Sequence, residues 1–127
     1  MKKYMFFLLA AFCLQTAVFS QNDKYVAAMQ KNLTAFDSAK TVEDLIKVAN
    51  TFERIGDAEK TQWLPYYYAG LVLCTSGWMP AVADKDENAG RINAFCDKAE
   101  AIAVSDADKA EILTIRNMAA TQQMIVD

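Results

Sequence analysis

The stretch that most constrains the fold is EKTQWLPYYYAGLVLC, which runs from Glu59 to Cys74. It holds a Trp, a Pro, three consecutive Tyr and then an almost purely apolar run. As a helix it would be apolar nearly all round. One side would carry Trp63, Tyr66, Gly70 and Leu73, and much of the rest would carry Leu64, Tyr68, Leu71 and Val72. Because such a helix is normally buried between neighbours, we predict that it forms the packed centre of the molecule.

The N-terminus reads as a secretory signal peptide covering residues 1–20. Lys2 and Lys3 form a short positive segment, an apolar run follows to Phe19, and Ser20 provides a small residue before a cut at Gln21. The apolar run is too short for a comfortable membrane span, which needs about 20 residues. A lipoprotein signal is rejected because Phe12 stands before Cys13. We therefore expect an exported protein, periplasmic or secreted.

The remaining residues 21–127 suit one small domain. The formal net charge of the whole chain is −3, and loss of the two lysines of the signal would make it −5. An acidic chain without a basic cluster argues against nucleic acid and anionic membranes as partners. No second apolar run approaches transmembrane length, so no membrane span is expected after cleavage.

Two cysteines remain after cleavage, Cys74 and Cys96, and export would place them where disulfides persist. If the third and fourth helices are antiparallel, the level opposite Cys96 is near Tyr66. Cys74 then lies some eight residues away, about 12 Å along the helix at 1.5 Å per residue. A disulfide needs Cα atoms within about 7 Å. We therefore predict two buried free thiols.

Apolar residues recur at helical spacing, and no alternating strand pattern is present. The first helix is predicted from Asp23 to Ser38. Thr41 opens the second, with Asp44 completing an approximate capping box, and Gly56 is expected to stop it. Pro65 fits the first turn of the third helix, where its missing amide proton would have no helical partner.

That third helix is predicted to run to about Ser76 and to end at Gly77. A fourth helix is expected from about Glu87 to Val104. Ser105 caps a fifth, with carboxylates in its first turn opposing the positive end of the helix. Five helices with short connections and no strands predict an all-α chain of antiparallel hairpins.

The hairpins show a degenerate repeat. Tyr66-x-x-Ala69-Gly70-x-x-Leu73 aligns with Ile115-x-x-Met118-Ala119-x-x-Gln122, and Tyr25-x-x-Ala28-Met29 fits the same frame. With FERIGDAEKTQWLPYYYAG and DKAEAIAVSDADKAEILTIRNMAA, this pattern resembles the small exported tetratricopeptide (TPR)-like proteins of Gram-negative bacteria. The resemblance covers most of residues 21–127. The spacings of 41 and 49 residues depart from the usual 34, and Val104-Ser105 replaces the proline that usually closes a repeat.

The resemblance implies a protein-interaction module or adaptor without catalytic activity. In such repeats the first helix of each hairpin lines a concave, partner-binding side. The implied face consists of Leu64, Tyr67 and Leu71 from the third helix, Leu113, Arg116, Ala120 and Gln123 from the fifth, and Val26 and Gln30 from the first. Tyr67 and Arg116 would lie side by side, which favours an acidic or C-terminal peptide as ligand. The alternative is that Tyr67 belongs to the core and Arg116 is a solvated charge.

Little in the chain points to catalysis. It has no His, which removes the commonest general base and metal ligand. It has no Gly-rich phosphate loop, and no cofactor or metal is expected. The run from Asp84 to Gly90 begins like a calcium loop, but Phe95 stands where the bidentate Glu belongs. The alternative function is a small-ligand-binding or enzymatic helical domain that uses the aromatic segment 63–68.

The end of the sequence, Met124-Ile125-Val126, is apolar and is followed by one Asp. Helical arrays normally finish with a helix whose outer face is polar. The fifth helix also lacks a following helix to complete its hairpin. We expect either that the sequence is a fragment or that this face meets another subunit, giving a homo-oligomer through the C-terminal helix.

Overall fold

The computed structural model describes residues 22–125, which fold into helices without a strand in that range. A first helix covers residues 22–38. It is followed by α2 (Val42–Glu59), α3 (Leu64–Gly77), α4 (Lys85–Glu100) and α5 (Asp106–Met124). The predicted all-α stack of hairpins is confirmed. The expected signal peptide, residues 1–20, and Val126 lie outside the described residues.

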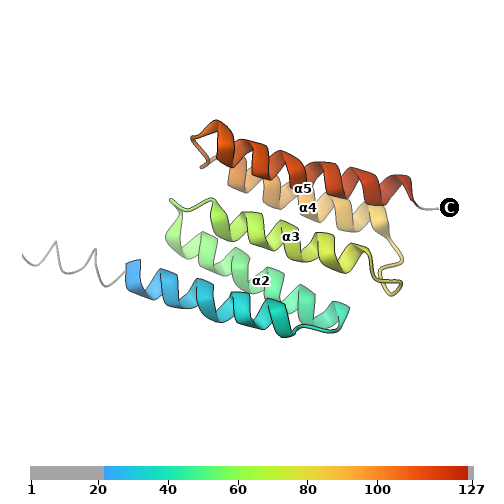
Figure 1. Ribbon diagram of the computed structural model, residues 1–127, viewed down its shortest axis with the longest axis horizontal. Helices are drawn as coiled ribbons and strands as arrows, with labels where there is room; N and C mark the ends of the chain where they lie inside the picture. Colours follow the sequence, from blue (N-terminus) through green and yellow to red (C-terminus); the bar gives the residue numbers. More distant parts are fainter. Residues whose placement is uncertain (1–21, 126–127) are drawn as a thin grey trace, which may run out of the picture.

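The helices follow one another back and forth, and α3 lies in the middle (Figure 1). It packs against α2, α4 and α5, and α4 packs against α5. Figure 1 shows the first helix passing in front of α2, and α5 passing in front of α4. As predicted, α3 is largely buried; its buried residues are Pro65, Tyr66, Ala69, Gly70, Val72, Leu73, Cys74, Ser76 and Gly77.

Most helix starts follow from local chemistry. Thr41 Oγ1 accepts a hydrogen bond from Asp44 N (3.1 Å), and Ser105 Oγ accepts one from Asp108 N (3.1 Å). Pro65 lies in the first turn of α3. These three predictions are confirmed. Each cap satisfies one backbone N–H of a first helical turn, which has no partner within the helix.

The bounds of α4 differ from the prediction at both ends. The helix begins at Lys85 because Asp84 Oδ1 accepts a hydrogen bond from Glu87 N at 2.8 Å. It ends at Glu100 instead of Val104. A short turn follows, in which the N–H of Ala103 donates to Ala99 O (2.9 Å), and the chain then extends into the cap of α5.

Gly56 does not end α2, so that prediction is wrong. The helix continues to Glu59, and Lys60 closes it with φ 60° and a bond from its N–H to Gly56 O (2.8 Å). Gly56 is instead a point of close approach. A Cβ there would lie 2.7 Å from Cζ of Tyr66, closer than real contacts allow. The missing side chain lets the Tyr66 ring lie directly on α2.

The C-terminal turn of α3 has all four of its last carbonyl groups paired. A helix cannot pair these groups internally, and leaving them buried without donors is costly. Two go to the following backbone: Thr75 O accepts from Trp78 N, and Ser76 O from Met79 N. The other two go to side chains from other helices. Cys74 O accepts from Gln122 Nε2 at 2.6 Å, and Gly77 O accepts from Lys85 Nζ.

A further buried amide lies in the same place, because Asn88 Nδ2 of α4 donates to Leu73 O at 3.0 Å. Gly77 leaves room for both amides. A Cβ at Gly77 would lie 2.1 Å from Gln122 Oε1 and 2.8 Å from Asn88 Nδ2. The polar residues Asn88 and Gln122 are therefore buried for a reason: they tie α4 and α5 to the end of α3.

We predict that Gln122→Leu lowers the free energy of unfolding by about 2 kcal/mol. The replacement keeps most of the side-chain volume but leaves Cys74 O buried without a donor. Gln123→Leu is the matched control, because the neighbouring Gln123 is exposed and its side chain bonds, among the described residues, only to Asp86. It should change stability by less than about 0.5 kcal/mol. Urea unfolding followed by circular dichroism measures both, and equal losses would contradict the role given to Gln122.

Candidate functional site: the exposed stripe of α3

One stripe of α3 contains no fully buried residue. Leu64, Tyr67 and Leu71 lie on it at spacings of three and four, and each is half-buried. Thr75, the next residue of the stripe, is exposed. We refer to Leu64, Tyr67 and Leu71 as the α3 stripe. It holds the three residues of α3 that the sequence analysis assigned to a partner-binding face.

The aromatic residues around the stripe pack on one another. The rings of Trp63 and Tyr67 meet edge to face at 5.6 Å, and those of Tyr67 and Tyr68 at 5.4 Å. Tyr68 stacks in turn on the fully buried Phe52 of α2, at 5.3 Å. Aromatic pairs at these distances add stability beyond the area that they bury. The aromatic segment is therefore anchored in the core through Tyr68 and presents Tyr67 toward solvent.

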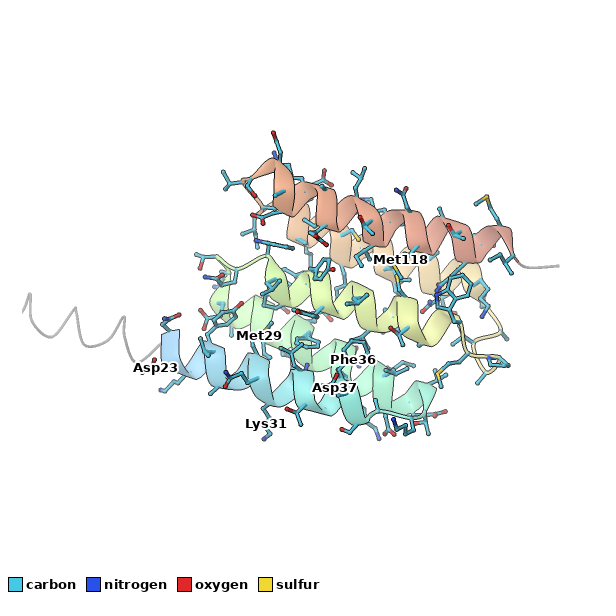
Figure 2. All side chains as sticks on the ribbon, in the orientation of Figure 1. Asp23, Met29, Lys31, Phe36, Asp37 and Met118 are labelled. Atoms are coloured by element: carbon cyan, nitrogen blue, oxygen red, sulfur yellow. The ribbon has the colours of Figure 1, made fainter. Side chains whose placement is uncertain are left out.

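The residue of α5 that meets the stripe is Glu111. The hydroxyl of Tyr67 donates to Glu111 Oε2 at 3.3 Å. Burial raises the pKa of the Tyr67 hydroxyl, and the nearby negative charge of Glu111 raises it further. Met118, seven residues after Glu111 and so on the same side of α5, lies between α5 and α3 (Figure 2). This side of the stripe thus carries an exposed carboxylate and an apolar side chain.

Arg116 points to a different neighbour. Its Nη2 lies 2.6 Å from Asp97 Oδ1 and 2.9 Å from Glu100 Oε2, both on α4. Its Nη1 bonds to Asn93 Oδ1 at 3.5 Å. The structure does not bring Arg116 beside Tyr67. The guanidinium that was expected to take a partner's carboxylate already has two carboxylates within the chain.

The other predicted residues of α5 also lie away from the stripe. Gln123, seven residues after Arg116, donates to Asp86 of α4 at 2.7 Å. Leu113 is 52% exposed, and Ala120, seven residues on, is exposed too. Glu111 and Met118 thus mark the side of α5 toward α3, and Arg116 and Gln123 the side toward α4. The predicted residues of α5 therefore lie on its α4 side (Arg116 and Gln123) or on its exposed side (Leu113 and Ala120), and none lies beside the stripe.

The cause is the register of the repeat. Tyr67 meets Glu111, 44 residues later, and Gly70 faces Ile115 and Gly77 faces Gln122, each 45 residues later. The sequence alignment used 49 residues, about one helical turn more. A pattern of large and small residues repeats every turn, so a shift of one turn matches almost as well. Glu111 was missed for this reason.

The first helix contributes Val26, which is 42% exposed, and Gln30, which is exposed. At the other end, Met124 and Ile125 of the expected oligomer face are 77% and 60% exposed. No contact in the described residues tests either expectation. Both stay predictions.

A polar cluster around Tyr66 joins α2, α3 and α4, away from the α3 stripe. The Tyr66 hydroxyl donates to Asp57 Oδ1 at 2.7 Å, and Lys98 Nζ donates to Glu53 Oε1 at 2.6 Å. Lys98 Nζ also lies 5.3 Å from the centre of the Tyr66 ring. Burial and the bond to Asp57 raise the pKa of Tyr66 to about 12, and the bond to Glu53 raises that of Lys98. Both groups stay protonated at neutral pH, and their hydrogen bonds join α2, α3 and α4.

Cys74 and Cys96 are free and buried, which confirms the prediction of two buried free thiols. Their sulfurs lie 3.8 Å from Ile115 O and 3.9 Å from Ile112 O, both on α5. Burial raises the pKa of Cys74 to about 12 and that of Cys96 to about 11. Since the thiolate is the reactive form, these raised pKa values disfavour reaction of either cysteine at neutral pH.

Among the described residues, no three His, Cys, Asp or Glu side chains gather as metal ligands. Asp84, which opens the calcium-like run, serves as the cap of α4. Within the same range of the chain, no helix combines the length and the apolar character needed to cross a membrane. Comparison with protein-family models, curated proteins and solved structures gives no match for this chain.

The raised thiol pKa values predict a loss of stability in base. The folded chain holds the two thiol protons more tightly than the unfolded chain, whose thiols have a pKa of about 8.5. The contribution is complete below about pH 8.5 and falls as the pH rises toward 11. We expect the urea concentration at the unfolding midpoint to be lower at pH 10.5 than at pH 8. The difference between the two pH values should be smaller in a Cys74→Ala variant. An identical fall in that variant would show that other groups, such as Tyr66, cause the effect.

Proposed function

We propose that the protein is an exported, non-catalytic binding module of the TPR-like kind, and that the α3 stripe is the centre of its partner-binding face. The observation that carries the proposal is the stripe itself. In an otherwise buried helix, Leu64, Tyr67 and Leu71 form an apolar line that no other described helix covers fully. Large, half-exposed apolar and aromatic side chains at helical spacing are the usual anchors for a partner segment.

The charges beside the stripe specify the partner. Within residues 22–125, the exposed Glu111 side chain bonds only to the Tyr67 hydroxyl, whereas Arg116 is held by Asp97 and Glu100. A bound segment would therefore meet a carboxylate next to the aromatic ring. The proposed ligand is an amphipathic peptide segment with two or three apolar residues and a Lys or Arg placed at Glu111. This replaces the acidic peptide expected from the sequence.

Two features support a binding role over an enzymatic one. The chain has no His, and its two thiols have raised pKa values. The alternative of a small-ligand pocket in segment 63–68 is less favoured, because Trp63, Tyr67 and Tyr68 fill the space between themselves. Fold alone does not fix a function, so the proposal depends on the stripe and its charges.

A selection experiment tests the stripe. Peptides selected for binding from a random display library should be amphipathic and basic, and their fluorescence anisotropy gives affinities. Leu71→Asp should weaken them at least tenfold, and Glu111→Gln about threefold with a reduced dependence on salt. Leu113→Asp is the matched control on the other side of α5 and should leave the affinity within twofold.

Circular dichroism must show native helix content for each variant. The proposal fails if the selected peptides are acidic, or if Leu71→Asp and Leu113→Asp weaken binding equally. It also fails if no selected peptide competes for the stripe. Glu111→Gln keeps the test decisive if Leu71→Asp unfolds, because Glu111 is exposed and its replacement removes only a charge.

Export is tested separately. We expect cleavage between Ser20 and Gln21 in the cell that exports the protein, from the Lys-Lys start, the apolar run and the small residue before the cut. Intact-mass measurement of the protein from the envelope or medium should give a chain that begins at Gln21. Ala17→Pro within the apolar run should reduce export. The amount of the protein that stays in the cytosol should then rise. A mature protein that still carries Met1 would contradict the prediction.

A further inference from the structure

A hollow of about 380 Å³ lies between the first helix and α2, away from the α3 stripe. Its apolar lining consists of Tyr25, Ala28, Ile55 and Ala58. It lies along the part of the first helix between Asp23 and Met29, which are labelled in Figure 2. A volume of this order and a mainly apolar lining with a few polar groups are typical of small-molecule sites.

Two cations flank the hollow, Lys24 from the first helix and Arg54 from α2. The ion pairs found among the described residues involve Lys47, Lys98 and Arg116, but neither Lys24 nor Arg54. Arg54 Nη2 donates to Thr51 Oγ1 at 3.0 Å. This neutral hydroxyl does not balance the positive charge of Arg54. In a chain of net charge −3, two cations beside an apolar hollow are a distinctive arrangement.

The register of the two helices places these cations close together. Asn32 Nδ2 of the first helix donates to Val48 O of α2 at 3.0 Å. Because the helices are antiparallel, this bond aligns Arg54 with a level two residues from Lys24, or about 3 Å along the axis. The two positive side chains thus flank one level of the hollow. A single anionic group placed there would meet both.

One carboxylate also lines the hollow, and it sets the direction of a ligand. Glu59 lies five residues beyond Arg54, about 7.5 Å further along α2, and by the same register about 4.5 Å from the level of Lys24. Burial raises the pKa of Tyr25, and the charge of Glu59 adds to the rise, which places Glu59 near the Tyr25 hydroxyl. An anionic head is therefore favoured at Lys24 and Arg54. Its apolar tail would extend over Ala28 and Ile55, away from Glu59.

We propose that this hollow binds a single-chain anionic amphiphile, a fatty carboxylate or an alkyl phosphate, with its head between Lys24 and Arg54 and its chain on Ala28 and Ile55. The two cations complement the head, and the apolar lining complements the chain. The site is separate from the α3 stripe and does not depend on the function proposed for it.

Isothermal titration calorimetry with dodecanoate tests the site. The protein is the full chain as the expressing cell processes it, and dodecanoate is kept below its critical micelle concentration. Dodecanoate should bind with one site per chain. Dodecyl phosphate distinguishes the two head groups and should bind as well or better, because its charge is larger. Dodecyltrimethylammonium has the same chain with the opposite charge, and it should bind at least tenfold more weakly.

Two double variants with the same charge change locate the head. Lys24→Gln with Arg54→Gln should weaken dodecanoate at least tenfold. Lys31→Gln with Lys47→Gln changes the same two helices outside the hollow, and Lys31 points away from the other helices (Figure 2). This control should leave the affinity within threefold. Ala28→Leu, at a half-buried position of the lining under the chain, should fill the hollow and weaken both anionic ligands.

The proposal is overturned if dodecanoate does not bind, or if the ammonium amphiphile binds as tightly. It is also overturned if the two double variants weaken dodecanoate equally, since the effect would then be one of net charge. The apolar C-terminal segment that begins at Met124 is the same in all variants. A difference in affinity between the variants therefore reports on the hollow.

Discussion

The buried C-terminal end of α3 is the constraint on which the rest of the structure depends. A helix that is apolar nearly all round must be covered on most sides, and the carbonyl groups at its C-terminal end then need donors from the protein. Each of these groups has a donor: two from the following backbone, one from Gln122 and one from Lys85. The two side-chain donors come from α5 and α4. The polar bonds fix where both helices lie, and Gly77 leaves the space for them.

Once α4 and α5 are fixed in this way, the open side of α3 is fixed as well. The close contact of Tyr66 with Gly56 places α2 on a further side. What remains is the line of Leu64, Tyr67 and Leu71, which is neither core nor fully solvated. The proposed binding face is thus a consequence of packing. The sides of α3 that hold the molecule together leave one apolar stripe for a partner.

Local chemistry made much of this fold predictable. Thr41, Ser105 and Pro65 act within one helical turn, and their roles follow from the residues beside them. Asp84 could have been found the same way, because Glu87 stands three residues later, as in a capping box. Gly56 could not. Its role depends on the ring of Tyr66, which the chain brings there only by folding, and the local rule for glycine favoured a helix end.

The candidate site was predictable in α3 and not in α5, for a physical reason. The stripe of α3 follows from which of its residues are apolar at a spacing of three and four. The matching side of α5 depends on the offset between the two helices, and a shift of one turn leaves the pattern of large and small residues almost unchanged. The shift nevertheless exchanges the neighbours: Glu111 takes the position assigned to Arg116. It thereby reverses the charge beside Tyr67, and with it the class of partner that the face would select.

The distribution of charge separates the two proposed surfaces. Arg116 and Lys98 are held by carboxylates of neighbouring helices, so they join the helices and offer little to a ligand. Lys24 and Arg54 have no such partner among the described residues and lie at the hollow, whereas the carboxylate of Glu111 lies at the stripe. Opposite charges beside two apolar surfaces exclude a shared ligand, because an anion suited to one is repelled by the other. The chain therefore presents two chemically distinct surfaces on one small helical stack.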